Sequence, residues 1–296
     1  MSSRLLTVTE LLQAPTGVDW NTIAENAGAA SPVQAIEEAN VIDRASAWVS
    51  AFCQQRLDAT TNSETARLAR NMAKTWVDRD GWLWFHTDLF PVLSVSAMSW
   101  AQAGAGMAPA NFTALVTANL QLYGDGGRVN RIADYSQDWS WLRTMTALIE
   151  LTYVNGYPNA MLAANTPIAG SAVTLQVDTT LGMSATAGAV GNTLTIYDGA
   201  NTEVVTVQSV TDATHVVVTT LAHQHNAAPQ IRVSALPADV NEAMVLACMD
   251  FARERGTMAW QMSGGGGEGP SVTRPGTGGA LEDAEYLLQP YRRVPV

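Results

Sequence analysis

The feature that most constrains the fold is a long stretch of β-like sequence that contains no basic residue. From Thr144 through Ile231 there is no Lys or Arg, and short runs rich in Val, Thr, Leu and Ile alternate with turn residues such as Asp198-Gly199. Runs of this kind are typical of strands, and an Asp-Gly pair favours a tight hairpin turn. We therefore predict a small all-β domain, sandwich- or barrel-like, over residues 166–234, with strands at 173–177, 193–197, 204–208, 215–219 and 230–233.

The segment that leads into this stretch, Leu148 to Pro158 (LIELTYVNGYP), predicts a buried strand that runs into a tight turn. Its first part is apolar, β-branched and aromatic, and Asn155-Gly156 followed by Pro158 is strong turn punctuation. The next convincing helix begins only at Pro237, where apolar residues again recur at helical spacing. We interpret the β-like stretch between the turn and this helix as a module inserted into another fold.

Helical patterns lie on both sides of that module. A short helix is expected from Thr7 to Gln13, and a long one from Pro32 to about Leu57, because a first-turn proline precedes apolar residues at helical spacing. The helix from Pro237 is expected to continue towards Trp260, and a last short helix contains Leu281 and Leu288. Residues from Gly264 to Gly279 have the composition of a flexible linker.

Together these patterns predict an α+β protein with a helical core, a β segment in that core and an inserted all-β domain. Residues 63–165 are assigned to strands because alternation and β-branching dominate there, as in Val92 to Met98. The predicted organisation is an N-terminal helical part of the core (1–62), a β-rich part of the core (63–165), the inserted β domain (166–234), a core helix (235–262), a Gly-rich linker (263–280) and a C-terminal helix with a docking tail (281–296).

The composition bears on the partners of the chain. Sixteen Lys and Arg against 27 Asp and Glu give a net charge of -11, which disfavours a protein that grips nucleic acid through its phosphates. No run of about 18 apolar residues occurs, and the first residues lack the apolar segment of a signal peptide. We expect a soluble protein made in a cytoplasm, with no membrane partner. Cys53 and Cys248 are expected to be buried, reduced thiols.

The sequence gives little support for catalysis or for a cofactor. Gly264-x-Gly266-x-x-Gly269 matches a dinucleotide fingerprint, but that motif needs a strand before it and a helix after it, whereas here a helix precedes and a proline follows. His223 and His225, with His215, suggest a metal site, yet no nearby carboxylate or cysteine completes a set of ligands. We interpret His223 and His225 as residues that decorate a turn, and we predict no catalytic residue, no cofactor and no metal.

A group of tryptophans is a candidate for packing or for contacts with other molecules. Trp82 and Trp84 share one face of a predicted strand, and Trp139 and Trp141 follow in the same β-rich part. Aromatic side chains supply large contact areas in cores and at protein interfaces, so we assign these residues to the core or to a subunit interface. A surface on which sugars stack is the alternative.

The last residues are a candidate docking tail. They follow a linker that gives them reach, and Arg and Tyr are favoured at interfaces; a frayed terminus is the alternative. The residues assigned to docking are Leu287, Leu288, Tyr291, Arg292 and Arg293.

In their order along the chain, these features resemble the head-to-tail connector, or adaptor, proteins of tailed bacteriophages. The resemblance rests on short motifs that lie before and after the inserted domain. They are Phe90-Pro91-Val92-Leu93-Ser94-Val95, Thr152-Tyr153-Val154-Asn155-Gly156-Tyr157-Pro158, Leu236-Pro237-Ala238-Asp239-Val240 and the tail from Glu285 to Arg293. In this family the Gly-Tyr-Pro turn leads quickly to the proline-started helix, whereas here residues 166–234 intervene.

The resemblance implies a structural virion protein and no enzyme. Such proteins form a ring, typically dodecameric, between the portal and the tail or the next neck ring, and the ring is a conduit for the genome. The implied partners are further copies of the chain, the portal protein on which the tail would dock, a tail-side neck or tail protein, and DNA that passes through the lumen without sequence-specific binding. The implied location is the virion neck, after synthesis in the host cytoplasm. An acidic ring would repel the phosphate backbone, which suits a conduit that must not retain DNA.

Two other functions stay open on the sequence. One is a carbohydrate-binding protein, secreted or carried on a virion, that uses the Trp-rich β surface. The other is a hydrolase whose catalytic residues come together from distant segments, although no local nucleophile motif supports it.

Overall fold

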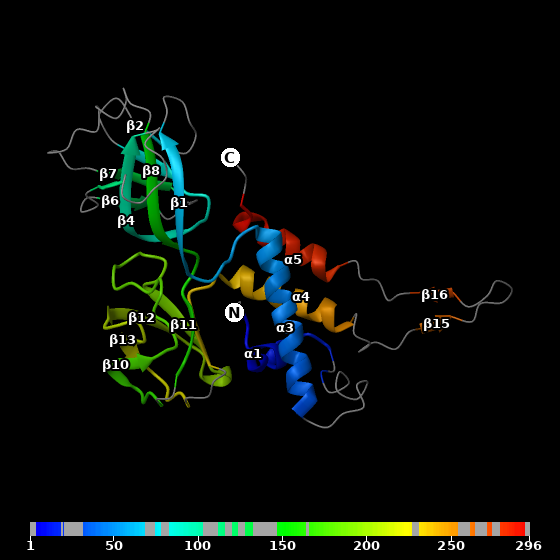
Figure 1. The fold of residues 1–296 in the computed structure, drawn as a ribbon. Coiled ribbons are helices and arrows are strands. Elements are labelled where there is room, and N and C mark those ends of the chain that lie inside the picture. The colour runs from blue at the N-terminus through cyan, green and yellow to red at the C-terminus, as the bar shows by residue number, and fades with distance from the viewer. Residues whose placement is uncertain are drawn as a thin grey trace.

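The computed structural model of the chain is α+β, as the sequence predicts, with the helices on one side and the four- and six-stranded β-sheets on the other (Figure 1). The residues that it describes are 4–18, 20, 32–68, 75–77, 83–102, 112–115, 120–123, 128–132, 147–163, 166–226, 231–253, 261–263, 271–273 and 279–293. Within those residues, no helix combines the length and the apolar character needed to cross a membrane.

The helical side consists of α1 (Val8–Gln13), α3 (Pro32–Cys53), α4 (Ala238–Ala252) and α5 (Ala280–Leu288), followed by the 3-10 turn η5 (Gln289–Tyr291). The helices begin where the sequence signals predict. Thr7 caps α1 and forms a capping box with Glu10, and α4 starts directly after Pro237. Side chains from all these helices share one hydrophobic cluster, in which Ile42 and Met244 have no exposed surface. We call this part the helical body.

The C-terminal ends of α3 and α4 are the two helix ends that do not simply match the expectation. α3 stops at Cys53 rather than at about Leu57, because Gln54 takes a left-handed backbone with a φ of 55° and turns the chain towards the sheets. The expected continuation of α4 towards Trp260 lies outside the described residues, which end at Arg253 in this region.

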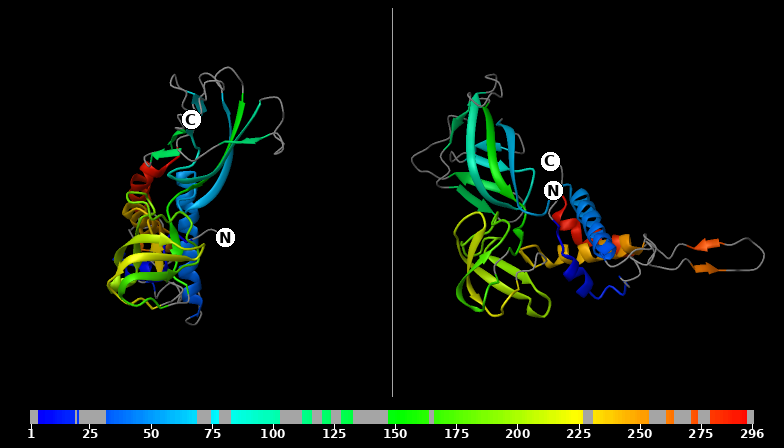
Figure 2. Two further views of the ribbon diagram at one scale, coloured as in Figure 1. Left: turned by 90° about the vertical axis from the view of Figure 1, so that its left-hand side faces the viewer. Right: turned by 60° about the horizontal axis from the view of Figure 1, so that its bottom comes forward.

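The strands from β9 to β14 form a six-stranded antiparallel sheet. Its strands, in spatial order, are β10 (Gly170–Gln176), β13 (His215–Leu221), β12 (Glu203–Val210), β11 (Thr193–Tyr197), β14 (Arg232–Ser234) and β9 (Asn159–Met161). Beyond its outer strands, Leu162 bridges Val177, and the Ala163 N–H donates to the Gln176 carbonyl at 2.7 Å. The sheet therefore curls until its two ends meet, as a partly closed barrel filled with Val, Leu and Ile side chains (Figure 2). We call it the barrel.

The strands predicted between residues 173 and 233 are confirmed, but two details differ. The sheet also takes in β9, which precedes residue 166. The hairpin predicted at Asp198-Gly199 is present, but its connection is longer than a tight turn, because a 3-10 turn, η3 (Gly199–Asn201), connects β11 to β12. The Asp198 N–H donates to Thr202 Oγ1 at 3.1 Å, so the connection is closed by a side chain three residues beyond Gly199 instead of by the Asp-Gly pair.

The strands from β1 to β8, which precede the barrel in the chain, form two four-stranded antiparallel sheets. One has the order β1 (Thr60–Leu68), β8 (Ala147–Asn155), β4 (Val92–Gln102), β5 (Thr113–Ala114), and the other has the order β2 (Thr75–Val77), β3 (Leu83–His86), β7 (Arg128–Ile132), β6 (Leu120–Tyr123). The two sheets share a hydrophobic cluster that includes Phe85 and Ile149. Among the described residues, no strand pairs with the outer edge of β1, although all nine of its residues pair with β8 on the inner side.

The strand and turn predicted at Leu148 to Pro158 are confirmed. β8 is paired on both sides, by β1 and β4, and its buried positions alternate with half-buried ones before the turn. Gly156 then takes a φ of +95°, and a Cβ there would lie 2.6 Å from the Asp58 carbonyl oxygen. Only glycine fits this turn, because both the backbone angle and the close approach exclude a side chain.

The segment expected to be a flexible linker is not wholly coil. β15 (Gln261–Ser263), whose first two residues were expected to belong to the core helix of 235–262, pairs with β16 (Ser271–Thr273). Both strands lie away from the helical body in Figure 1 and in the right-hand view of Figure 2. β-branched Val272 and Thr273 favour an extended backbone, which explains why this part of the expected linker forms a strand. Residues 264–270 and 274–278 lie outside the described residues.

Candidate functional site

The predicted docking tail lies folded against its own chain. Leu288 is fully buried in the cluster of the helical body, and Leu287 packs against that cluster. The Tyr291 ring packs edge-on against Tyr157, with the ring centroids 6.3 Å apart, and its carbonyl accepts the Gln55 Nε2–H at 2.9 Å. Burial raises the pKa of the Tyr291 hydroxyl, and the nearby Asp239 and Cys53 raise it further, so the hydroxyl stays neutral.

The two arginines of the tail differ in exposure. The Arg293 N–H donates to the Cys53 carbonyl at 2.9 Å, and its guanidinium lies 3.2 Å from the Asp88 carboxylate. Arg292 is exposed, with its guanidinium 5.5 Å from the centre of the Phe52 ring. Of the residues assigned to docking, Arg292 is therefore the one that faces outwards.

Further hydrogen bonds extend these contacts to the sheets. Gln55, whose amide holds the tail, also accepts the Phe90 N–H at 3.0 Å, and the Gly156 N–H donates to the Pro91 carbonyl at 2.9 Å. The Tyr157 N–H donates to the Leu57 carbonyl at 2.7 Å. The end of α3, the start of β4, the turn after β8 and the tail thus meet in one place, which we call the tail junction; it consists of Gln55, Leu57, Phe90, Pro91, Gly156, Tyr157, Tyr291 and Arg293.

Tyr286 is an exposed aromatic residue that the sequence analysis did not single out. It lies on α5 and is 80% exposed, while Ala284 and Leu288 of the same helix are buried. The signal was available, because Tyr286 falls two positions after Ala284 and therefore on the opposite side of the helix from the buried stripe.

The tryptophans fall into two groups. Trp84 lies half-buried on β3 and is paired with Trp76 of β2 across the sheet. Trp82, Trp139 and Trp141 lie outside the described residues, so the structure does not place the rest of the predicted aromatic surface.

Cys53 and Cys248 are buried and free of a disulfide, as expected. Burial raises the pKa of the Cys53 thiol to about 12, although the charge of Arg292 opposes the rise. Burial also raises the pKa of the Cys248 thiol. Both thiols therefore stay protonated near neutral pH and act as small apolar side chains of the helical body.

A buried charge network joins the barrel to the helical body. The Arg232 side chain has no exposed surface, and its Nη2 lies 2.7 Å from Oε1 of Glu10, which belongs to α1. The same guanidinium donates to Asn241 of α4 at 2.9 Å and to Asn159 of β9 at 3.3 Å. It also lies over the ring of Tyr197, 4.2 Å from its centre. Arg232 of β14 thus contacts two helices, α1 and α4, and two further strands, β9 and β11.

Sequence reasoning missed this network because its members are distant in sequence. Glu10 and Arg232 are far apart in the chain, so no local pattern links them. One signal was present, since Arg232 is the first basic residue after the cation-free stretch that ends at Ile231. A lone arginine between apolar strand residues must find a buried acceptor, because an unpaired charge is not tolerated in a core.

His225 does not decorate the turn as predicted. Its ring has no exposed surface and lies between two carboxylates, with Nδ1 2.9 Å from Asp198 Oδ2 and Nε2 2.9 Å from Glu203 Oε1. Neither carboxylate is close to His225 in the sequence, because Asp198 follows β11 and Glu203 begins β12, whereas His225 follows β13. His223, in contrast, is exposed. The described residues contain no cluster of three or more His, Cys, Asp or Glu that is arranged to hold a metal ion.

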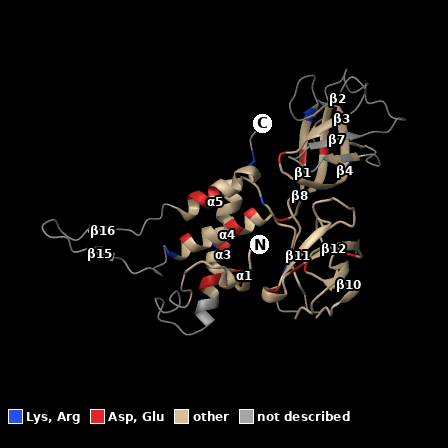
Figure 3. Cartoon of the chain, turned by 180° about the vertical axis from the view of Figure 1, so that it is seen from behind, with Lys and Arg blue, Asp and Glu red and all other residues tan. Residues whose placement is uncertain are grey.

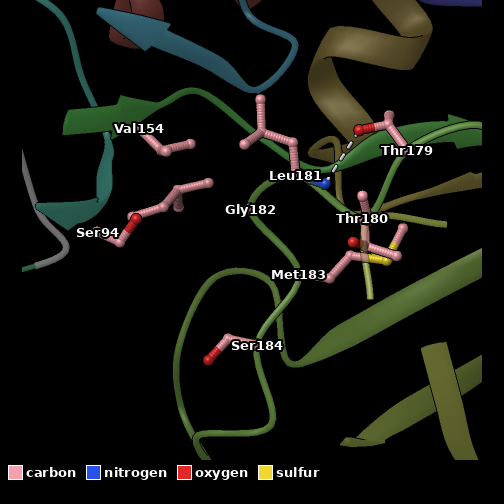
Figure 4. A pocket seen from close by; sticks show the side chains of 10 residues that line it. Ser94, Val154, Thr179, Thr180, Leu181, Gly182, Met183 and Ser184 are labelled. Atoms are coloured by element: carbon pink, nitrogen blue, oxygen red, sulfur yellow. Dashed lines mark hydrogen bonds between the residues drawn. The ribbon is translucent and has the colours of Figure 1, made fainter. Parts of the chain in front are cut away.

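A cavity of about 330 Å³ lies between the first sheet and the barrel (Figure 4). It is lined by Leu93 and Val154 on one side and by the barrel segment from Thr179 to Ser184 on the other. Its walls are apolar groups and hydroxyls, and no residue that lines it is charged. Gly182 at its edge takes a φ of +82°, which favours glycine, and a Cβ there would lie 2.5 Å from the end of the Leu93 side chain. The lining offers no acid, base or nucleophile other than hydroxyl groups.

The helical body has an acidic surface. α4 and α5 contain no Lys or Arg within their bounds, and Figure 3 shows acidic residues along both. The exposed carboxylates on these two helices are those of Asp239, Glu242, Glu282, Asp283 and Glu285.

Comparisons of the chain with protein families, with curated proteins and with solved structures give no match.

Proposed function

We propose that this protein is a head-to-tail connector of a tailed bacteriophage, a structural protein that forms a ring between the portal and the tail or the next neck ring. The ring is dodecameric, as the resemblance implies, and serves as a conduit for the genome in the virion neck. The observation that carries the proposal is the tail junction. Three motifs of the resemblance, those at Phe90, Tyr157 and Tyr291, bond to one another there through Gln55 and its neighbours.

The tail junction matters because short motifs are weak support when only their order is known. The motifs come from segments that are far apart in the chain, yet they build one structural unit. A shared unit gives them a common physical reason to occur together, which separate surface segments would not have.

The finer organisation that we propose is a helical core that builds the ring and a barrel inserted at the Gly-Tyr-Pro turn. It is supported by the neighbourhood of Pro158, whose carbonyl accepts both the Ala235 N–H at 2.9 Å and the Ser234 hydroxyl at 3.1 Å. Asn159 and Ser234 are also paired across neighbouring strands. The barrel segment thus starts and ends at adjacent points, as an insert requires.

The acidic surface of α4 and α5 suits the lumen of such a ring. Its exposed carboxylates have no Lys or Arg beside them within either helix, so a polyanion that passes is repelled rather than bound. We propose that the α4 part of this surface, with Asp239 and Glu242, faces the DNA, which passes without sequence-specific contacts, and that a tail-side neck or tail protein binds the opposite end of the ring.

Portal docking is assigned to the exposed side chains of the C-terminal segment. Leu288, Tyr291 and Arg293 hold this segment on the helical body, whereas Tyr286 and Arg292 point to solvent. Exposed aromatic and arginine side chains on a fixed helix are the residue types that dominate interface energetics. The sites that we propose for portal contact are therefore Tyr286 and Arg292, supported from beneath by Leu287.

Electron microscopy tests the ring. Purified protein is mixed with the portal of the same virus, since a ring can need the portal as a template, and the complex and the virion necks are imaged. Ring-shaped density of this protein on the portal is expected. A portal that carries no added density, together with virion necks that lack the protein, would contradict the proposal. Binding of the protein to a glycan array would instead favour the carbohydrate-binding alternative.

Variants of the C-terminal segment test docking. Tyr286→Ala combined with Arg292→Ala is expected to weaken portal binding by roughly tenfold or more, as loss of central interface residues does. Glu242→Ala, at an exposed position of α4, is the matched control and should bind like the parent. Truncation at Gly264 is a poor test, because it also removes α5, whose Ala284 and Leu288 belong to the buried cluster.

A further inference from the structure

The cation-free stretch gives the barrel an unusual set of charges. Between residues 166 and 231 the only side chains that can carry a positive charge are His215, His223 and His225. His215 lies 2.9 Å from Asp212, and His225 lies 2.9 Å from both Asp198 and Glu203. The ion pairs formed within this segment therefore exist only while a histidine holds its second proton.

The geometry at His225 determines where the proton lies. An ionised carboxylate only accepts hydrogen bonds, and a neutral imidazole has a single N–H to donate. With a carboxylate oxygen 2.9 Å from each ring nitrogen, a neutral ring would leave one nitrogen lone pair against an oxygen. Both contacts are hydrogen bonds only when the ring is the doubly protonated imidazolium.

Glu203 does not take that proton instead. Burial favours its neutral form, but the N–H groups of Ala222 and His223, at 2.8 and 2.9 Å, together with His225 outweigh burial, so the pKa of the Glu203 carboxyl is lowered. Asp198 is the other acidic group that faces the ring, and it is partly exposed. On the remaining side, the His225 N–H donates to the Pro167 carbonyl at 3.1 Å, which is uncharged.

This cluster lies where the barrel meets the helices. Asp198 is flanked by Tyr197, whose hydroxyl accepts the Asn241 Nδ2–H of α4 at 2.7 Å, and by Gly199, which lies so close to Gln13 of α1 that a Cβ would be 2.7 Å from its amide nitrogen. Asp198 also precedes η3, in which the Asn201 N–H donates to the Asp198 carbonyl at 2.9 Å. Movement of the Asp198 carboxylate therefore displaces residues that contact both helices.

We propose that His225, Asp198 and Glu203 form a proton-operated clamp that fastens the η3 end of the barrel to the helical body. The clamp is closed while the ring holds two protons, and its contribution to stability is lost as the pH rises and the ring gives up the second proton. On the acid side it is lost again when the Glu203 carboxylate takes up a proton, which happens below the ordinary range of a glutamate because the pKa of this carboxyl is lowered. The clamp does not depend on the proposed ring function, since it lies within one chain.

Nitrogen NMR of the histidine rings tests the clamp without changing the protein. In full-length protein at pH 6, the His225 nitrogens are expected to show the imidazolium signature on both Nδ1 and Nε2. The exposed His223 ring, recorded in the same spectra, is the internal comparison. A singly protonated His225 ring at pH 6 would overturn the proposal.

Stability measurements give a second, independent test. The unfolding equilibrium constant of the parent is expected to rise roughly tenfold more than that of His225→Gln between pH 5.5 and pH 8.5, which is the scale of one charge-assisted hydrogen bond. His223→Gln should keep the slope of the parent. Parallel profiles for the parent and His225→Gln would overturn the clamp.

Hydrogen exchange locates the effect and covers the case in which His225→Gln does not fold. In the parent protein, exchange at the Asn201 and Thr202 amides, corrected for its intrinsic pH dependence, is expected to accelerate above neutral pH, whereas amides in the middle of α4 should not change. Equal protection of the η3 amides at pH 6 and pH 8.5 would contradict the proposed loosening.

Discussion

The helical body and the barrel handle charge in opposite ways. At the borders of the helical body, carboxylates are paired with arginines, which keep their charge at any ordinary pH: Glu10 with Arg232, and Asp88 with Arg293. Inside the barrel segment three of the four carboxylates, those of Asp198, Glu203 and Asp212, face histidines. One chain therefore contains ion pairs whose charges stay fixed near neutral pH and, in our proposal, ion pairs that depend on the second proton of a histidine. The difference shows that composition, and not only geometry, decides how a domain responds to its surroundings.

The largest effect is expected from Arg232→Met. Removing the guanidinium leaves Glu10 buried without its partner, and breaking a buried pair in this way costs about 3–5 kcal/mol of unfolding free energy. Urea unfolding measures it. The loss should be constant between pH 5.5 and pH 8.5, because neither partner titrates as a histidine does; a loss that follows pH would break the comparison. Glu10→Gln added to Arg232→Met should restore part of the stability, and Arg292→Met, at an exposed site, should cost little.

Cavity variants test whether the two regions unfold as one unit. Leu194 in the barrel and Met244 in the helical body have no exposed surface, and truncation of either to alanine is expected to cost about 2–5 kcal/mol. Because the Arg232 network ties the regions together, each variant should shift a single unfolding transition seen by circular dichroism. Two transitions, with each variant moving only its own, would show that barrel and body are independent.

A glycine pair isolates the close packing of the turn after β8. Gly156→Ala and Gly188→Ala both place a side chain at a positive φ, of +95° and +81°, which by itself costs about 1–2 kcal/mol. At Gly156 the new Cβ would also meet the Asp58 carbonyl at 2.6 Å, whereas at Gly188 nothing lies within 4 Å. Gly156→Ala should therefore lower the thermal midpoint more than Gly188→Ala does. Equal midpoints would mean that the turn is loosely packed.

The smallest effect is expected at Asp212. The N–H of Thr214 and the His215 ring lower the pKa of this exposed carboxyl to about 2. A depressed folded-state pKa adds stability that is present above the unfolded value, which is near 3.9, and is lost as the pH falls from about 4 to 2. Carbon NMR of the carboxyl should follow a midpoint near pH 2 in the parent and a higher midpoint in Thr214→Gly combined with His215→Ala, which removes the hydroxyl and imidazole donors but keeps both backbone N–H donors. An ordinary midpoint in the parent would refute the assignment.

Local signals in the sequence predicted local structure. Pro32 and Pro237 mark helix starts because a proline fits the first turn, and the strand of Leu148 to Asn155 follows from its side-chain pattern. The hairpin at Asp198-Gly199 was predicted correctly but the length of its connection was not, since the side chain of Thr202 closes a longer connection there.

The charged contacts could not be predicted, because they depend on how distant segments pack. His225 seemed to lack a carboxylate partner, yet it meets both Asp198 and Glu203 once β11, β12 and the segment after β13 lie side by side. Arg232 and Glu10 are brought together only by the packing of the barrel on α1. The pattern of side chains along the sequence does not show which distant charged residues pair. It indicates only that a buried charge needs a partner of opposite charge.

The double hydrogen bond on the Pro158 carbonyl has a practical consequence for engineering. Because the chain leaves and returns at one carbonyl group, the barrel segment occupies a position where another folded domain with adjacent ends can be grafted without forcing the body apart. A simple excision of Thr166 to Ser234 would not be neutral, since it removes Arg232 and leaves Glu10 facing an empty interior. Any replacement domain must therefore place a positively charged side chain next to Glu10 of α1.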